Sequence, residues 1–295
     1  MKRSSCPGFG EIDVRAASAD HARAVVLPIA YEAGPSYGTG AGDAPLHVLA
    51  ASEQLEIIDE QTLTRWAGKG GVYTLPLLKP DEAGKAAIGL IEKAALPHLT
   101  AGRFLLSIGG DHAVTIGLVA AAAKVFPGAG VLQIDAHLDL RDEWNGSRFN
   151  HACVMRRIAD DFHMPFVQAG IRTIAPEEAA YIKKNGISPF FANQIDPHDD
   201  SWMDEAIERL PEQVYLTVDV DGLDPAVMPG TGTPEPGGFS FRQVVELVRR
   251  LGRCRKVIAA DITEVVKIPG TQVSEYTAAR IAEKIILYCA REKEE

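Results

Sequence analysis

The chain has 295 residues, of which 46% are hydrophobic and 24% are charged, and its formal net charge is −10. This composition is typical of a soluble globular protein, and the lack of a basic block or of interleaved arginines and aromatics excludes nucleic acid as an expected partner. No apolar run approaches the roughly 18 residues that a membrane span needs, so we expect no membrane association.

The four cysteines lie far apart and form no CxxC motif. Thiols without a disulfide pattern are typical of a reducing compartment. The first residues also lack the long apolar run of a signal peptide. We therefore expect a cytoplasmic protein.

Strand-like apolar runs alternate with helix-like segments along the chain. Residues 1–22 are polar and weakly patterned, and we expect them to form a poorly ordered or peripheral segment. A glycine-rich loop at 34–42 lacks the GK[ST] ending of a P-loop, and two roles are open for it: a rim or subunit contact, or part of a substrate pocket. The expected strands lie at 24–30, 103–108, 131–135, 166–171, 189–192, 213–218 and 256–262, and the expected helices at 45–55, 83–96, 113–126, 150–161, 176–184, 199–210, 240–251 and 274–290.

This alternation predicts an α/β protein, with a mainly parallel sheet that helices cover on both faces. No linker, repeat or low-complexity stretch divides the chain, so we expect a single domain over residues 1–295. In sheets of this kind, binding sites lie beyond the carboxyl ends of the strands.

Three side chains that can bind a metal follow the apolar run Gly130–Ile134. They are Asp135, His137 and Asp139, in the motif DAHLD. On an extended chain the three side chains share one face, because side chains alternate with a period of two. Such a cluster is costly near a core unless cations compensate it.

A second cluster of the same kind follows the strand expected at 213–218. Asp219 and Asp221 stand two residues apart at its end, and His112 stands just after Gly109 and Gly110 at the end of another strand. A lone DxD or a lone histidine is more often a turn or a structural residue. Here three strand ends converge in residue type and in position, which favours a metal site over a structural cluster.

Six ligands are more than one ion uses, but two ions a few ångströms apart can share them through bridging carboxylates. The set is rich in oxygen, with one imidazole per ion, which favours Mn²⁺ over Zn²⁺ and leaves Ni²⁺ or Co²⁺ possible. The six expected ligands are His112, Asp135, His137, Asp139, Asp219 and Asp221.

The order and spacing of three motifs resemble the ureohydrolase family of arginases and agmatinases. The motifs are GGDHA at 109–113, DAHLD at 135–139, and the segment 219–238 that begins DVDGLDP and ends PGTGTPEPGG. The resemblance is greatest to agmatinases. It implies a three-layer α/β/α fold, a centre with two Mn²⁺ ions, and a homo-oligomer that is a trimer or a hexamer.

The resemblance also implies a role for each ligand. One ion would take His112, Asp135, Asp139 and Asp219, and the other would take His137, Asp135, Asp219 and Asp221. A hydroxide between the ions would attack the guanidinium carbon, and Asp139 would take its proton and pass it to the leaving amine. The products would be urea and an amine.

Two further residues match family positions. His151 matches a histidine that moves protons at the mouth of the active site, and Glu264 matches a glutamate that pairs with the substrate guanidinium, as a carboxylate can through two parallel N–H bonds. The chain departs from the family pattern at Ala113, at 152–153 and at 266–267. None of these departures removes a ligand.

The choice of substrate is expected to depend on Arg141 and Glu235, two specificity candidates outside the metal motifs. Glu235, or Asp142 with Glu143, suits a second cation, whereas Arg141 suits a carboxylate. Agmatine ranks first as the small guanidino substrate, an ω-guanidino acid such as guanidinobutyrate or guanidinopropionate second, and arginine third. Two other classes stay open: a different binuclear metallohydrolase, such as a phosphoesterase, and a catalytically silent family member.

Overall fold

The computed structural model describes residues 7–34 and 36–291. Eight strands form one sheet, and every strand pairing in it is parallel. In sheet order they are β2 (Val72–Thr74), β1 (Ala24–Pro28), β3 (Phe104–Ile108), β8 (Lys256–Thr263), β7 (Gln213–Asp219), β4 (Gly130–Ile134), β5 (Phe166–Ile171) and β6 (Phe190–Phe191).

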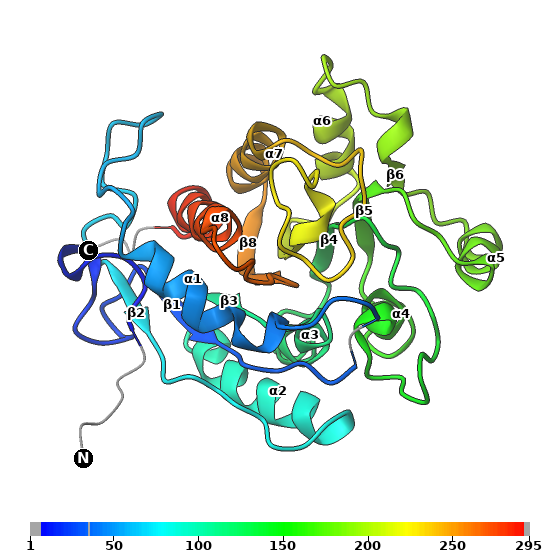
Figure 1. Cartoon of the computed structure of the whole chain (residues 1–295), viewed down its shortest axis with the longest axis horizontal. Coiled ribbons are helices and arrows are strands. Elements are labelled where there is room, and N and C mark those ends of the chain that lie inside the picture. The colour runs from blue at the N-terminus through cyan, green and yellow to red at the C-terminus, as the bar shows by residue number, and fades with distance from the viewer. Residues whose placement is uncertain (1–6, 35, 292–295) are drawn as a thin grey trace.

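Helices cover both faces of the sheet (Figure 1). One face is covered by α1 (Ala44–Ser52), α6 (Ser201–Glu208), α7 (Phe241–Cys254) and α8 (Val273–Cys289). The other is covered by α2 (Lys85–Thr100), α3 (Val114–Val125), α4 (Val154–Asp160) and α5 (Pro176–Asn185). The predicted three-layer α/β/α fold with a parallel sheet is therefore confirmed.

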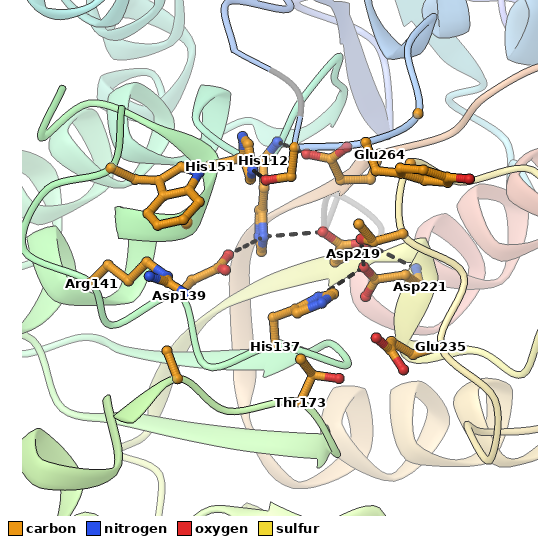
Figure 2. Close-up of a pocket in the computed structure, with 18 of the residues that line it drawn as sticks. His112, His137, Asp139, Arg141, His151, Thr173, Asp219, Asp221, Glu235 and Glu264 are labelled. Atoms are coloured by element: carbon orange, nitrogen blue, oxygen red, sulfur yellow. Dashed lines mark hydrogen bonds and ion pairs between the residues drawn. The ribbon is translucent and has the colours of Figure 1, made fainter. Parts of the chain in front are cut away.

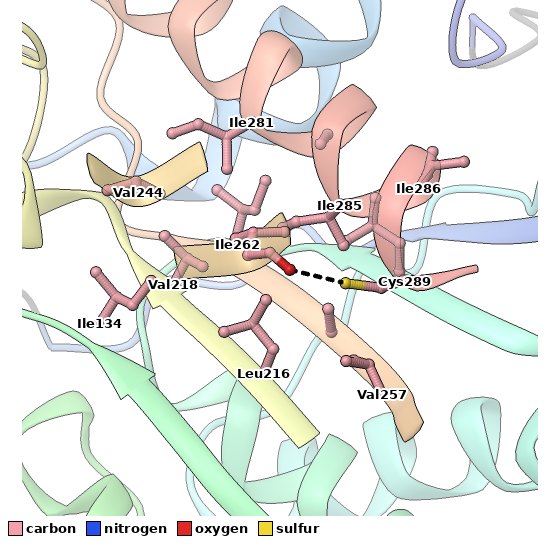
Figure 3. Close-up of a cluster of buried hydrophobic side chains, with 14 of the residues drawn as sticks. Ile134, Leu216, Val218, Val244, Val257, Ile262, Ile281, Ile285, Ile286 and Cys289 are labelled. Atoms are coloured by element: carbon pink, nitrogen blue, oxygen red, sulfur yellow. Dashed lines mark hydrogen bonds between the residues drawn. The ribbon is translucent and has the colours of Figure 1, made fainter. Parts of the chain in front are cut away.

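The two core layers follow from alternation along each strand. In β1, Ala24 and Val26 pack into one apolar cluster, and Val25 and Leu27 pack into the other. All five residues of β1, β3 and β4 are buried, as is typical of parallel strands between two helical layers. Figure 3 shows the first cluster, where residues of β4, β7 and β8 meet α7 and α8. Burial of each such aliphatic side chain contributes about 1.5–3 kcal/mol to the free energy of unfolding.

Local sequence explains where α7 begins. The Ser240 hydroxyl accepts from the backbone N–H of Gln243 at 3.2 Å, and the Gln243 side chain accepts from the backbone N–H of Ser240 at 3.0 Å. This capping box satisfies two amide groups that the first helical turn leaves unpaired. Ser240 is thus the N-cap of α7, at the start of the helix that the sequence predicts at 240–251.

Two regions differ from the sequence prediction. The edge strand β2 was not expected, because three residues between glycines and prolines are too short to show a periodic pattern. Within the segment 1–22, residues 1–6 lie outside the described residues. From residue 7 the segment is anchored at two points, because Phe9 and Val14 are buried and Phe9 packs edge-on against Trp66 with ring centroids 5.8 Å apart, whereas most of residues 11–21 are exposed or half-buried.

The described residues contain no helix that is long and apolar enough to cross a membrane. The four central strands β3, β8, β7 and β4 are consecutive neighbours in the sheet. Their carboxyl ends therefore meet at one edge, where the predicted motifs follow.

Candidate metal centre and active site

The four central strands each deliver a polar side chain to one cluster, and three of these side chains, His112, Asp219 and Glu264, line a cavity. His112 follows β3, Glu264 follows β8, Asp219 ends β7, and Asp135 follows β4. Figure 2 shows His112, Glu264 and Asp219 facing one cavity. The cavity has a volume of about 310 Å³.

Close packing explains the glycines of the GGDHA motif. A Cβ on Gly110 would lie only 1.7 Å from the carbonyl oxygen of Tyr31, so no larger residue fits. The next residue, Asp111, is buried and accepts the backbone N–H of Ala33 at 2.9 Å. The motif thereby places His112 and also holds the start of the loop at 34–42.

The DAHLD segment does not continue the strand as we expected. β4 ends at Ile134, and Asp139 has a φ of 51°, in the left-handed region. A non-glycine residue there is uncommon and strained, so the segment turns back instead of extending. The turn brings Asp139 to His112, and Asp135 and His137 still face the same cluster.

The predicted ligands form two overlapping groups. The Nδ1 atom of His112 lies 2.9 Å from Asp139, 3.2 Å from Asp135 and 3.3 Å from Asp219, measured to carboxylate oxygens. The Nδ1 atom of His137 lies 3.0 Å from Asp221 and 3.5 Å from Asp135. Two metal-competent groups result, His112–Asp135–Asp219 and Asp135–His137–Asp221, and Asp135 belongs to both.

The electrostatics of the cluster fit divalent cations. The four aspartates are at most 5% exposed, and the buried Nδ1 of His112 has no hydrogen-bond partner. Burial together with Asp135 raises the pKa of Asp139 to about 7, and burial with Asp221 and Asp135 raises that of Asp219 well above its usual value. Although burial opposes it, Asp221 and Asp135 raise the pKa of His137 to about 12. Buried carboxylates of this kind need a compensating positive charge, which two divalent ions held by these atoms would supply.

A buried hydroxyl network supports His112 from behind. Its Nε2 lies 2.8 Å from the Thr217 hydroxyl, which donates to Asp261 at 2.7 Å. Asp261 also accepts the hydroxyls of Tyr215 at 2.6 Å and Thr115 at 2.9 Å. Because the Thr217 proton points to Asp261, Thr217 can only accept from His112. His112 therefore carries a proton on Nε2 and turns Nδ1 to the cluster, where the neutral ring could bind a metal ion.

Glu264 lies beside the metal cluster in a second strained turn. Its φ is 63°, and its Oε1 accepts the backbone N–H of His112 at 2.7 Å. Burial raises its pKa well above the usual range, with a further increase from Asp111. One carboxylate edge is thus fixed by His112 while the residue lines the cavity.

His151 stands at the cavity wall, in the 3-10 turn His151–Cys153 that precedes α4. Its Nε2 lies 2.8 Å from the hydroxyl of Ser36 in the loop at 34–42. Burial and the nearby His112 and His137 lower its pKa to about 4. His151 therefore joins the cavity to this loop as a neutral ring.

The two specificity candidates, Arg141 and Glu235, both line the cavity. Arg141 forms an ion pair with Glu177, and its guanidinium lies 4.0 Å from the ring centroid of Trp144. Of the departures from the family pattern, Ala152 lines the cavity, whereas Lys267 pairs with Glu275 at 2.9 Å, away from the lining residues.

Sequence reasoning missed several lining residues. Ser36, Tyr37 and Gly38 come from the glycine-rich loop, which indicates the pocket role for that loop. The glycine content of this loop indicated an unusual backbone conformation, but it did not indicate where the loop lies in the fold. The other missed residues are of two kinds: Gly232 and Thr233 lie inside the third motif, whereas Trp144, Thr173, Ala175 and Glu178 stand in no motif.

Comparison with known proteins shows to which family the chain belongs. The profile of the arginase family matches residues 22–289. The chain belongs to the arginase family. The sequence prediction of this family is therefore confirmed.

Curated relatives and a solved structure lie within the same family. The chain is 40% identical over 274 residues to the N(1)-aminopropylagmatine ureohydrolase of Synechocystis sp., covering 90% of this chain and 89% of the relative. It is 34% identical over 278 residues to the agmatinase of Pyrococcus horikoshii, covering 90% and 92%. The agmatine ureohydrolase structure from Thermoplasma volcanium superposes with a TM-score of 0.83 at 26% identity, covering 92% and 91%.

Proposed function

We propose that this arginase-family member hydrolyses a guanidino compound to urea and an amine at a centre that holds two metal ions. The observation that carries the proposal is the pair of overlapping ligand groups that share Asp135. Glu264 lines the same cavity and is the carboxylate best suited to receive a guanidinium there.

The ligand distances support most of one assignment, and the resemblance to the family adds Asp219 as a ligand of the second ion. One ion would be held by His112, Asp135, Asp139 and Asp219, and the other by His137, Asp135, Asp219 and Asp221. Mn²⁺ suits a set with this share of carboxylate oxygens, with Ni²⁺ and Co²⁺ as alternatives. Two such ions, when bound, would lower the pKa of water enough to supply a hydroxide nucleophile near neutral pH.

The side chains around the ions have distinct roles. Glu264 holds the substrate guanidinium in register through its carboxylate. Asp139, beside the Nδ1 atom of His112 at the edge of the cluster, would take a proton and return it to the leaving amine nitrogen. His151, with its ring at the cavity wall, moves protons between this site and solvent.

Agmatine, which would yield putrescine, is the first candidate substrate. N(1)-aminopropylagmatine is a second, favoured by the relative at 40% identity that is named for it. An ω-guanidino acid and arginine rank lower, because the Arg141 guanidinium that would receive a carboxylate is already paired with Glu177. A role in polyamine biosynthesis follows from either of the first two candidates.

The wider setting is also part of the proposal. We place the protein in the cytoplasm, since its cysteines show no disulfide pattern and the three in the described residues are free. We propose a single domain over residues 1–295 and a homo-oligomer, a trimer or a hexamer.

Urea release tests the proposal. The Mn²⁺-loaded protein is assayed with agmatine, N(1)-aminopropylagmatine, guanidinobutyrate and arginine, and with a phosphate ester as control. We expect urea from the first two at the highest kcat/KM. Hydrolysis of the phosphate ester without urea would indicate another metallohydrolase, and no turnover of any compound would indicate a silent family member.

A further inference from the structure

The cavity lining contains few charged groups besides the metal cluster. Among the described residues they are Arg141, Glu178, Glu235 and Glu264. Glu264 faces the metal cluster and is the proposed guanidinium partner. The other three decide what the far end of the substrate meets, so the partners of each matter.

The Glu178 carboxylate accepts hydrogen bonds from two backbone N–H groups. Its Oε1 accepts the N–H of Leu140 at 2.9 Å, and its Oε2 accepts the N–H of Ala175 at 2.9 Å. Both oxygens therefore close the loop after the DAHLD motif and the first turn of α5. Glu178 is a structural residue that has little capacity left for a ligand.

Arg141 is also engaged. Glu177 neutralises its charge, and the Trp144 ring covers its guanidinium at 4.0 Å. A substrate carboxylate would have to displace both contacts. Arg141 thus belongs to the wall of the cavity, and an anionic substrate end gains little there.

Glu235 differs from both. Within the described residues its carboxylate has no hydrogen bond or ion pair, and only its main-chain oxygen is engaged. Figure 2 shows Glu235 across the cavity from Arg141, with its carboxylate pointing inward beside Thr173. An unpaired carboxylate at a cavity wall is a natural partner for a cation.

Arg172 fixes the loop that carries Glu235. Its Nη2 donates to the main-chain oxygens of Glu235 at 2.6 Å and of Asp221 at 2.5 Å. The guanidinium donates its hydrogen bonds to carbonyl groups, so it attracts the Glu235 carboxylate through space but forms no hydrogen bond with it. The same side chain therefore holds both the loop of a metal ligand and the loop of Glu235.

We propose that Glu235 binds the ammonium group at the far end of the substrate, opposite the guanidinium end held by Glu264. This inference rests on the proposed function and narrows its substrate class to alkylguanidines with a cationic amine at the other end. Agmatine and its N(1)-aminopropyl derivative both carry such an amine, whereas ω-guanidino acids carry the opposite charge.

The other acidic residues suggested by the sequence do not fit this role. Asp142 pairs with Arg157 at 2.5 Å and with Arg148 at 3.2 Å. Glu143 is exposed and lies outside the cavity lining. Glu143 is consequently a matched control, because its change to glutamine removes the same charge elsewhere on the molecule.

The test compares two substrates in four Mn²⁺-loaded proteins: the wild type, Glu235→Gln, Glu235→Asp and Glu143→Gln. Agmatine carries the ammonium, and 1-butylguanidine has the same four-carbon chain without it. We expect Glu235→Gln to raise the KM for agmatine about tenfold with little change in kcat, the effect of losing one charge-assisted hydrogen bond. Its KM for 1-butylguanidine should stay that of the wild type. Glu235→Asp should restore part of the agmatine affinity, and Glu143→Gln should behave as the wild type.

Equal losses for both substrates in Glu235→Gln would mean a structural role and would overturn the inference, as would an unchanged KM for agmatine. Calorimetric binding of 1,4-diaminobutane gives a readout that does not need turnover. We expect Glu235→Gln to bind this diamine more weakly than the wild type does. Equal binding by the two proteins would overturn the inference. If the wild type released no urea from any guanidino compound, the proposed function would fail, and the diamine binding would still decide whether Glu235 receives an ammonium group.

Discussion

Two residues of the site have a left-handed backbone conformation that residues other than glycine rarely adopt. Asp139 has a φ of 51° and Glu264 a φ of 63°. Each such residue costs about 1–3 kcal/mol, which the surrounding structure must offset. The two turns aim one carboxylate at His112 and the other at the cavity beside it. Of the five non-glycine residues with a positive φ in the described part of the chain, two are thus the carboxylates to which we assign proton transfer and substrate binding.

Replacing Asp139 by asparagine tests the first of these roles. An amide cannot take and return a proton, so we expect Asp139→Asn to reduce kcat by at least about 10²-fold. The fold should remain intact by circular dichroism, because the side chain keeps its shape. Near-normal urea release by this variant would contradict the role.

The hydroxyl network behind His112 leads to a second prediction. Thr217→Val removes the acceptor that holds the Nε2 proton, so we expect metal affinity to fall by about 10–100-fold. Thr217→Ser keeps the hydroxyl and should bind metal as the wild type does. Competition with a chelator for Mn²⁺ measures both. A valine variant with unchanged affinity would show that the network is not needed to orient His112.

The sequence predicted more of the metal centre than of the substrate pocket. Each of the six ligand candidates stands in a short motif at a strand end, and the structure brings all six together. Tyr37 and Trp144 could not be predicted, because they come from loops whose path depends on tertiary packing. Arg141 was a reasonable candidate for an anion, but its pairing with Glu177 is visible only in three dimensions.

At the scale of elements, strand order decides which motifs meet. β8 lies between β3 and β7, so Glu264 reaches the backbone of His112 although 152 residues separate them. The alternation of elements predicted a parallel sheet, but no local signal in the sequence states that its last strand enters the centre. The residues of the site could therefore be predicted from the sequence, but the order of the strands that brings them together could not.

The last helix contains a buried ion cluster that ties down a distant loop. Lys284 of α8 forms an ion pair with Asp59, and their side chains are 1% and 0% exposed. Asp59 in turn accepts the backbone N–H groups of Gln61 at 3.0 Å and Thr62 at 2.8 Å. The turn that follows Asp59 is thus built around a carboxylate that α8 neutralises.

Lys284→Met leaves this carboxylate buried without its cation. Removing one partner of a buried pair costs about 3–5 kcal/mol, so we expect a clearly lower midpoint of urea unfolding. The double variant Asp59→Asn with Lys284→Met removes both charges and should recover part of the loss. An unchanged midpoint in the single variant would show that the pair does not stabilise the fold.

At the scale of the whole molecule, the sheet edge concentrates negative charge in one place. Four buried aspartates and Glu264 meet there, although the rest of the acidic surplus is spread over the chain. Ions that bind the folded state and not the unfolded state stabilise it, so metal loading and folding should be linked. The fold and the reaction then depend on the same cluster.

Titration of Mn²⁺ into protein stripped with EDTA, followed by urea release from agmatine, tests the central claim most directly. We expect no urea from the stripped protein and a rate of urea release that rises with added Mn²⁺ and levels off at two ions per chain. Urea release that is independent of added metal, or that is complete at one ion per chain, would contradict a two-ion centre built on Asp135.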